Sequence, residues 1–268
     1  MKKKAVFFDA DGTLCDIEKG VPKSTKEALR TLRKNGHEAW LCTGRSRAFV
    51  ADYLEELPFT GMISGCGSTI EKDGKRLYNK ELTQEQAWHC VEVLRTYGLI
   101  PVMEGADFMY YDKEEYNTSV NWYADLITEA LGERWRPIKG FEKDMHINKI
   151  SAKMLEGCDA DRACEELSVY FDVIRHESGS FAGTTIELVP KGHNKAVGIA
   201  AVLKLFEIPW EDSVVFGDSN NDIAMFEYAH TKIAMGNSST RIKELADHIT
   251  GDMFHYGIRD GLRYLGLI

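Results

Sequence analysis

The sequence lacks a long apolar segment behind its basic start. After three lysines, the apolar stretch covers only residues 5–8 before Asp9 interrupts it. A helix that spans a bilayer needs about 20 apolar residues. The stretch is therefore too short for an export signal or a membrane anchor, and we expect a protein with neither.

Positive charge is scarce relative to negative charge. Lysine and arginine total 33, against 42 for aspartate and glutamate, which leaves a formal charge of −9 at pH 7. Such a chain attracts nucleic acid weakly and presents no polybasic patch to a membrane. We therefore expect a small-molecule partner, no nucleic acid and no membrane, while the oligomeric state stays open.

Cysteines with the spacing of a metal site or a disulfide framework are also absent. The six cysteines stand far apart, at positions 15, 42, 66, 90, 158 and 164. Zinc sites need closely spaced ligand pairs, and disulfide frameworks belong to secreted chains. We therefore expect reduced thiols in a cytoplasmic protein.

Short apolar runs alternate with helical patterns at both ends of the chain. Strands are expected over residues 6–8, 38–42, 61–64, 213–216 and 232–235. Helices are expected over residues 24–35, 47–56, 195–206, 239–246 and 257–265, the first with capping-box spacing from Ser24 to Glu27 and the third capped by Asn194. This alternation predicts an α/β fold with a parallel sheet.

The rhythm changes in the middle of the chain. Asp73 and Gly74 predict a hairpin turn between residues 69–71 and 76–78. Helices are then expected over 83–97, 120–131 and 159–170, with short strands over 100–103, 148–154, 172–176 and 184–189. The mixture predicts an inserted α+β domain at 83–188, between core segments 1–82 and 189–268. No repeat or low-complexity linker marks its ends.

Two carboxylates directly follow the first apolar run. Asp9 and Asp11 stand one residue apart where a buried strand is expected to end. Burying two neighbouring anions is costly unless a cation or a shared proton accompanies them. In open α/β sheets, ligands bind beyond the carboxyl ends of the strands, which is where this pair is expected. The pair thus indicates a binding site.

Polar side chains follow other expected boundaries as well. These are Thr43 after the second strand, Lys195 at a helix start, and Asp218 and Asp222 after the strand at 213–216. Oxygen ligands without histidine or cysteine favour Mg²⁺, which also accepts phosphate oxygens. A threonine hydroxyl and a lysine can stabilise a phosphoryl group in transfer. Together these residues indicate phosphoryl transfer, with a carboxylate able to act as the nucleophile.

Four motifs occur in chain order. They are Asp-x-Asp-Gly-Thr-Leu at residues 9–14, Thr43-Gly44-Arg45, Lys195, and Gly-Asp-Ser-Asn-Asn-Asp at 217–222. The chain thereby resembles the haloacid dehalogenase superfamily, and more narrowly its Cof-type phosphatases with a large inserted cap. The resemblance spans nearly the whole chain and implies a Rossmann-like core with an α+β cap. One departure is Cys66-Gly67-Ser68, where related sequences commonly have Asn-Gly-Ala.

The resemblance also implies a role for each motif residue. Asp9 attacks phosphorus to form an aspartyl phosphate, and Asp11 protonates the leaving alcohol and then deprotonates the hydrolytic water. The implied Mg²⁺ ligands are Asp9, Asp11 through its main-chain carbonyl, Asp218, and Asp222 directly or through water. The implied phosphate-binding residues are Thr43, Gly44, Lys195 and Asn221, with Arg45 and Glu187 as candidate substrate contacts.

We therefore expect Mg²⁺-dependent hydrolysis of small phosphate monoesters, either sugar phosphates or phosphorylated cofactors. Covalent catalysis divides a very slow hydrolysis into two easier steps. A sugar phosphomutase of the same superfamily is the alternative enzyme, and a non-catalytic phosphate-binding protein is the third class. Loss of Asp9 or Asp11 would mark that third class, and both residues are present.

Overall fold

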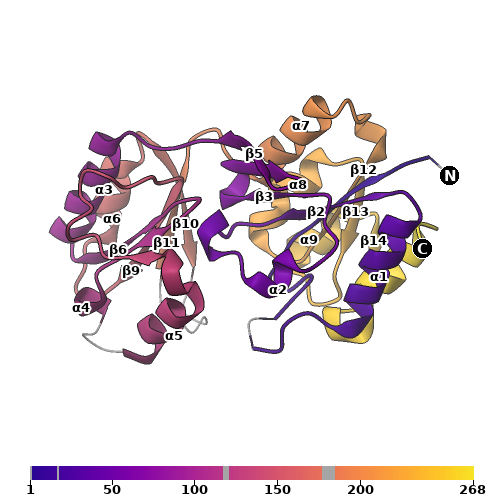
Figure 1. Cartoon of the computed structure of the whole chain (residues 1–268), viewed down its shortest axis with the longest axis horizontal. Helices are drawn as coiled ribbons and strands as arrows, with labels where there is room; N and C mark the ends of the chain where they lie inside the picture. The colour runs from indigo at the N-terminus through magenta and orange to yellow at the C-terminus, as the bar shows by residue number, and fades with distance from the viewer. Residues whose placement is uncertain (1, 17, 117–120, 177–184) are drawn as a thin grey trace. The chain divides into compact units, whose positions relative to one another are not determined.

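The chain forms two compact units in the computed structural model (Figure 1). The structure describes residues 2–16, 18–116, 121–176 and 185–268. The first unit comprises residues 1–45, 50–78 and 193–268, and the second comprises 46–49 and 79–192. Each unit has its own sheet and its own apolar core.

The first unit is built on an eight-stranded sheet with the strand order β14-β13-β12-β1-β2-β3-β4-β5. Its strands are β1 (Ala5–Phe8), β2 (Glu38–Cys42), β3 (Gly61–Ser64), β4 (Thr69–Lys72), β5 (Lys75–Asn79), β12 (Ser213–Gly217), β13 (Thr231–Ala234) and β14 (His248–Ile249). The strands from β14 to β3 run parallel, and β4 is antiparallel to β3. The predicted α/β fold is confirmed. The predicted hairpin is confirmed as well, with Asp73 and Gly74 left-handed at φ 50° and 71°.

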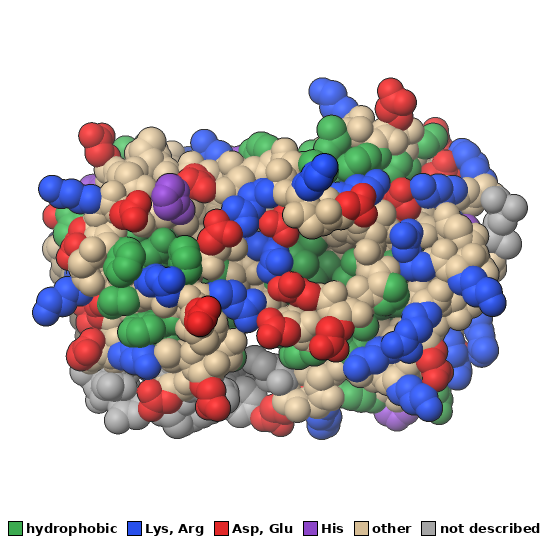
Figure 2. All heavy atoms as spheres, viewed as in Figure 1, with side chains coloured by type: hydrophobic (Ala, Val, Ile, Leu, Met, Phe, Trp, Pro, Cys, Tyr) green, Lys and Arg blue, Asp and Glu red, His purple; other side chains and the backbone are tan. Residues whose placement is uncertain are grey.

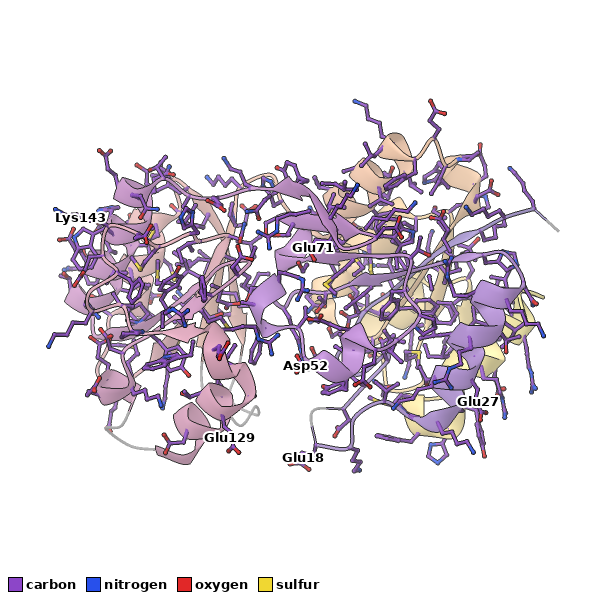
Figure 3. All side chains as sticks on the ribbon, viewed as in Figure 1. Glu18, Glu27, Asp52, Glu71, Glu129 and Lys143 are labelled. Atoms are coloured by element: carbon purple, nitrogen blue, oxygen red, sulfur yellow. The ribbon has the colours of Figure 1, made fainter. Side chains whose placement is uncertain are left out.

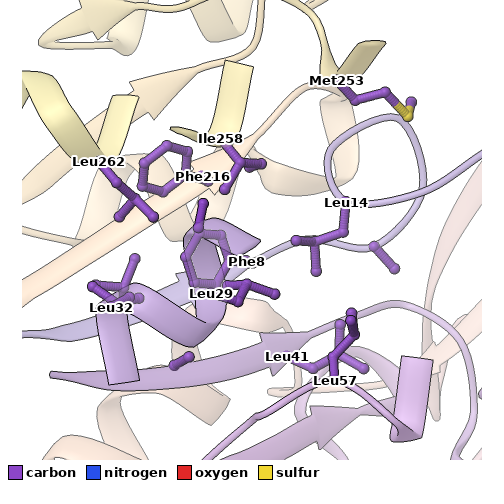
Figure 4. Close-up of a cluster of buried hydrophobic side chains, with 14 of the residues drawn as sticks. Phe8, Leu14, Leu29, Leu32, Leu41, Leu57, Phe216, Met253, Ile258 and Leu262 are labelled. Atoms are coloured by element: carbon purple, nitrogen blue, oxygen red, sulfur yellow. The ribbon is translucent and has the colours of Figure 1, made fainter. Parts of the chain in front are cut away.

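Helices cover both faces of this sheet. They are α1 (Lys23–Lys34), α2 (Asp52–Glu55), α7 (Lys195–Leu205), α8 (Ile223–Tyr228), α9 (Thr240–Leu245) and α10 (Gly257–Tyr264), with short 3-10 helices η2 (Gly65–Gly67), η4 (Trp210–Asp212), η5 (Asn220–Asp222) and η6 (Met253–His255). On one face, Phe8 and Phe216 pack against α1 and α10 (Figure 4). On the other, Phe7 and Val215 pack with residues of α7 and α8. Because side chains alternate along a strand, β1 and β12 contribute to both apolar layers.

The second unit contains a six-stranded, mostly antiparallel sheet with the strand order β10-β11-β9-β6-β7-β8. Its elements are α3 (Gln84–Thr96), β6 (Leu99–Glu104), β7 (Met109–Tyr110), α4 (Lys113–Tyr116), α5 (Asn121–Leu131), η3 (Gly132–Arg134), β8 (Trp135–Arg136), β9 (Lys149–Met154), α6 (Ala160–Leu167), β10 (Phe171–His176) and β11 (Thr185–Pro190). Residues of α3 and α6 pack on one face of this sheet around Ile150 and Leu188. The predicted α+β character is confirmed. The expected starts of a helix at Val120 and of a strand at Thr184 lie outside the described residues.

Two local predictions are wrong. The helix expected over 47–56 is broken into η1 (Arg47–Phe49) and α2, because Ala51 is extended at ψ 145°. Ala48 packs in an apolar cluster of the second unit and Val50 in the core of the first, so burial overrides the helical pattern. Ser24 does not cap α1, because the helix begins at the preceding residue.

The surface carries both signs of charge. On the face seen in Figure 2, acidic and basic side chains are interspersed. Glu18, Glu27 and Asp52, labelled in Figure 3, are exposed. Within the described part of the chain, the buried carboxylates are Asp9, Glu38, Glu104, Asp212 and Asp222. These few buried anions need a physical explanation, because burial of a charge is costly.

The helices and cysteines complete the description. Among the described residues, no helix combines the length and the apolar character needed to cross a bilayer. All six cysteines lie in the described part of the chain, and none forms a disulfide.

Candidate active site

Three adjacent strands of the first unit bring polar residues together at their carboxyl ends. In the sheet, β1 lies between β12 and β2, and all three run parallel. Asp9 follows β1, Thr43 follows β2, and Asp218 follows β12. Because parallel strands end at the same edge of a sheet, these residues share that edge. Asp9 and Thr43 are buried there.

Lys195 supplies a buried cation at this edge. Asn194 caps the start of α7, and Lys195 is the first residue of that helix. The Lys195 Nζ donates to Asp9 Oδ1 and Asp222 Oδ1, both at 2.5 Å, and to Asn221 Oδ1 at 3.2 Å. Burial alone would lower the pKa of Lys195, but Asp222 and Asp9 raise it well above its ordinary value. A charged lysine thus joins the first motif to the fourth.

The loop after β12 holds the carboxylates of the fourth motif. Asp222 Oδ2 accepts hydrogen bonds from the backbone amides of Asp218 and Ser219, at 2.9 and 3.1 Å. Asp218 Oδ1 accepts from the Thr13 hydroxyl at 2.9 Å, and its Oδ2 accepts from the Asn237 amide at 3.3 Å. Neutral donors therefore fix both carboxylates, and Asp222 also pairs with the charge of Lys195.

Gly12 allows Asp218 to lie against the first motif. A Cβ atom at Gly12 would lie 2.2 Å from Asp218 Oδ2, and the Gly12 φ is 81°. Both the close approach and the left-handed backbone favour glycine over every other residue. The Asn237 side chain also donates to the Gly12 carbonyl at 2.9 Å. The turn after β1 is thus held to the loops after β12 and β13.

Three carboxylates at this edge form a candidate cation site. Asp9, Asp218 and Asp222 each offer one oxygen, and these oxygens lie within 4.8 Å of one another. Burial, followed by the charge of Asp222, raises the pKa of Asp9 well above its ordinary value and raises the pKa of Asp218 to about 6. When ionised, these three carboxylates carry more negative charge than the single lysine beside them offsets. Three hard oxygen donors with that excess fit a divalent cation.

Asp11 has a different cationic partner. Arg45 Nε donates to Asp11 Oδ2 at 2.9 Å, and Arg45 Nη2 donates to Asp11 Oδ1 at 2.6 Å. The Asp11 carboxylate is not part of the group formed by Asp9, Asp218 and Asp222. Arg45, a candidate substrate contact, thus contacts the predicted general acid in this structure.

The remaining phosphate-binding candidates lie together beside Cys66. The Cys66 amide donates to the Thr43 carbonyl at 3.2 Å. A Cβ atom at Gly44 would lie 3.5 Å from Cys66 Sγ and 3.8 Å from Asn221 Nδ2. Since Asn221 also contacts Lys195, these four predicted residues share one region of the first unit.

Cys66 itself has a left-handed backbone, with φ 54° and ψ 40°, and is buried. Asparagine and glycine adopt this conformation most readily among the amino acids. The asparagine that the family resemblance implies at this position would suit the same backbone. The departure therefore keeps the turn but replaces an amide by a small thiol.

Glu187, the other candidate substrate contact, belongs to β11 of the second unit. Its Oε2 lies 3.3 Å from the Nζ of Lys149, which lies 3.8 Å from Glu104 Oε1. The Ser151 hydroxyl donates to the same Glu104 oxygen. Glu187 is therefore part of a polar cluster on the sheet of the second unit.

Sequence reasoning missed Thr13 and Asn237 as partners of Asp218. Thr13 lies within the first motif, so its hydroxyl was available as a signal. Asn237 follows β13, which neighbours β12 in the sheet. The rule that polar residues gather beyond parallel strand ends would have found it.

Comparisons with known proteins add the family. A family model described as haloacid dehalogenase-like hydrolase matches residues 6–262. The 5-amino-6-(5-phospho-D-ribitylamino)uracil phosphatase YitU of Bacillus subtilis (strain 168) is 25% identical over 262 residues, which cover 93% of this chain and 92% of YitU. The pyridoxal phosphate phosphatase YbhA of Escherichia coli (strain K12) is 24% identical over 265 residues, which cover 94% of each chain.

A solved structure is similar over the same length. The crystal structure of a hypothetical protein from Geobacillus kaustophilus HTA426 is 27% identical, covers 100% of both chains and has a TM-score of 0.85. The family model, the four motifs and the strand-end cluster agree with one another. The chain therefore belongs to the haloacid dehalogenase-like hydrolase family, as an enzyme of the phosphatase type that its motifs predicted.

Proposed function

We propose that this protein hydrolyses small phosphate monoesters with the help of Mg²⁺, through a phosphoryl group carried by Asp9. The observation that supports this most strongly is the buried Lys195 between Asp9 and Asp222, with Asp218 in the same cluster. The lysine orients the Asp9 carboxylate and offsets the negative charge of an approaching phosphoryl group. An ordinary surface ion pair would do neither, because solvent screens it.

Charge balance supports a divalent cation as the cofactor. When ionised, Asp9, Asp218 and Asp222 carry three negative charges, and Lys195 offsets one of them. The two remaining charges equal the charge of one Mg²⁺ ion. The three carboxylates would hold the ion, with the main-chain carbonyl of Asp11 as the fourth predicted protein ligand. When bound, Mg²⁺ would polarise the phosphoryl group and lower its repulsion from Asp9.

The chain's own residues account for the bond changes. Asp9 supplies an electron pair to phosphorus, and the bond from phosphorus to the ester oxygen breaks. The ester oxygen takes a proton from the Asp11 carboxyl as it leaves. In the second step, Asp11 takes a proton from water, whose oxygen attacks phosphorus and releases inorganic phosphate and Asp9. The residues proposed to bind the phosphoryl oxygens are Thr43, Gly44, Lys195 and Asn221.

Sugar phosphates and phosphorylated cofactors are the proposed substrates. YitU and YbhA are named for two small phosphorylated molecules, a phosphoribitylamino uracil and pyridoxal phosphate. Two such names among the relatives support a small organic phosphate over a phosphorylated macromolecule. We also propose a cytoplasmic location, since cysteines that form no disulfide suit a reducing compartment.

The test is release of inorganic phosphate from a panel of metabolite phosphates and from 4-nitrophenyl phosphate, with Mg²⁺ and with EDTA. Asp9→Asn should lower phosphate release at least about a thousand-fold, because it removes the nucleophile. Asp52→Asn, at an exposed carboxylate, is the matched control and should keep wild-type activity. Substantial turnover by Asp9→Asn would refute the proposal. An isomerised monophosphate in place of free phosphate, after addition of a sugar bisphosphate, would show a mutase.

A further inference from the structure

Two cations divide the carboxylates of the proposed active site between them. Lys195 pairs with Asp9 and Asp222, at 2.5 Å each. Arg45 pairs with Asp11 through one edge of its guanidinium, where Nε and Nη2 donate to the two carboxylate oxygens at 2.9 and 2.6 Å. Within the described part of the chain, the nucleophile and the general acid proposed above are thus held by different side chains. A separate cation for Asp11 needs its own explanation.

Arg45 is the more firmly held residue of the pair that it forms with Asp11. The Arg45 side chain is 10% exposed, whereas the Asp11 side chain is 54% exposed. The Arg45 backbone is anchored at both polar groups, because its amide donates to Thr43 Oγ1 at 3.1 Å and its carbonyl accepts from the Gly65 amide at 2.7 Å. An anchored arginine therefore holds an exposed carboxylate.

The two-point contact restricts Asp11 more than a single charge would. A planar guanidinium that bonds both oxygens fixes the position and the rotation of a carboxylate. An exposed aspartate without such a partner samples several rotamers. Proton transfer requires the donor oxygen within hydrogen-bond reach of the leaving oxygen, so a freely rotating Asp11 would deliver its proton less often.

We propose that Arg45 is a positioning residue, which acts on the reaction by aiming the Asp11 carboxylate rather than by binding phosphate. This inference rests on the proposed function, in which the ester oxygen leaves with a proton from Asp11. Arg45 forms and breaks no bond in either step. It determines only how often Asp11 is in place when the bond from phosphorus to the ester oxygen breaks.

Leaving groups of different basicity separate the two roles. An alkyl oxygen needs the proton to leave, whereas a 2,4-dinitrophenolate leaves without one. If the Asp11 carboxylate is no longer held in position, hydrolysis of a sugar monophosphate should therefore slow down. Hydrolysis of a dinitrophenyl ester should hardly change. Loss of a phosphate-binding cation should weaken the binding of both substrates equally, since both carry the same phosphoryl group.

The experiment measures kcat and KM of Arg45→Ala, Arg45→Lys and Asp11→Asn with two substrates. One is a sugar monophosphate that the wild-type protein hydrolyses, and the other is 2,4-dinitrophenyl phosphate. Arg45→Ala should lower kcat for the sugar phosphate about a hundred-fold, which is within the usual range for general acid catalysis. For the dinitrophenyl ester, the same variant should lower kcat less than about ten-fold. The KM of either substrate should change little. Arg45→Lys keeps the charge but loses the two-point contact, so it should show the same selective loss.

A double variant adds a second readout. If Arg45 acts through Asp11, Arg45→Ala combined with Asp11→Asn should be no slower than Asp11→Asn alone. Arg259→Ala, which breaks another arginine–aspartate pair of the first unit, is the matched control and should leave both substrates unaffected. Circular dichroism of each variant reports folding.

Two outcomes would overturn the inference. Equal losses for both substrates, with raised KM, would assign Arg45 to phosphate binding. Additive losses in the double variant would show that it acts independently of Asp11. In either case, the wild-type protein would still release phosphate and Asp9→Asn would still lose this activity. Failure of the proposed function would instead appear as a wild-type protein that releases no phosphate.

Discussion

Each unit of this protein buries a lysine between carboxylates, but the surroundings of the two lysines differ. Lys195 and Lys149 are both nearly inaccessible, at 1% and 2% exposed. The partners of Lys195 lie on loops beyond parallel strands, at 2.5 Å. The partners of Lys149, Glu104 and Glu187, stand on neighbouring strands of the second sheet, at 3.8 and 3.3 Å.

The charge balance also differs. On the second sheet, Lys149 and Lys153 share one strand and one face, and the two glutamates lie on the strands at either side. Two lysines and two glutamates thus share this face of the sheet. At the proposed active site, one lysine accompanies three carboxylates. The comparison teaches that buried charge alone does not indicate a cation site, whereas a buried excess of one sign does.

The largest expected difference between the two lysines is in turnover. Lys195→Met should lower phosphate release at least about a thousand-fold, because Asp9 and Asp222 lose the cation that orients them. Lys149→Met should retain easily measured turnover and instead lower the free energy of unfolding by about 3 kcal/mol, because a buried ion pair loses one partner. Phosphate release and urea unfolding of both variants check this. Comparable turnover losses in the two variants would remove the distinction.

The next effect concerns metal and pH at the proposed active site. In EDTA-treated protein, Mg²⁺ at a hundred times its dissociation constant should stabilise the fold by about 2.7 kcal/mol. Burial raises the pKa of Asp218 to about 6, so this carboxyl holds its proton more tightly when folded than when unfolded. Its contribution to metal-free stability is therefore complete below pH 4 and is lost as pH rises through about 6.

Thermal unfolding between pH 4 and 8, with and without Mg²⁺, measures both parts of that prediction. Asp218→Asn should remove most of the Mg²⁺ effect and flatten the metal-free pH dependence. Glu187→Gln, in the polar cluster of the second unit, is the control and should keep both. An undiminished response to Mg²⁺ in Asp218→Asn would contradict the cation site.

The smallest effect belongs to the second unit. His146 Nδ1 lies 2.9 Å from Glu81 Oε2, and this hydrogen bond raises the pKa of His146. A raised histidine pKa stabilises the folded state at low pH, and the contribution is lost as pH rises above the ordinary value of about 6.5. The pair is half exposed, so His146→Gln should cost only a few tenths of a kcal/mol at pH 5.5 and nothing at pH 8.5. Mg²⁺ should leave this difference unchanged, which separates it from the titration of Asp218.

Two predictions that depend only on neighbouring residues are confirmed in this chain. Asn194 caps α7, and Asp73 with Gly74 forms the hairpin turn, because a cap or a turn is decided by backbone groups a few residues away. The capping box at Ser24 failed because α1 begins at Lys23, two residues too early for Ser24 to be its N-cap. The strands β7, β8 and β14 have two residues each, and two residues have no periodicity to detect.

Residues that serve two units could not be predicted in this way. The pattern over 47–56 is helical, but Ala48 and Val50 are buried in different apolar clusters. The backbone conformation of Cys66, where the chain departs from the family pattern, could not be predicted from the local sequence either. Its left-handed backbone lies between two glycines and beside a hydrogen bond to Thr43, and cysteine itself does not favour this conformation.

The sequence by itself determined the α/β fold and the placing of carboxylates and cations directly after apolar strands, and from these it predicted an edge that binds a phosphoryl group. Only the tertiary structure decided which cation meets which carboxylate. Lys195 reaches Asp9 across 186 positions of the chain, and Arg45 reaches Asp11 across 34. The physical reason is that these pairs depend on the strand order β12-β1-β2, which forms only when distant segments close into one sheet.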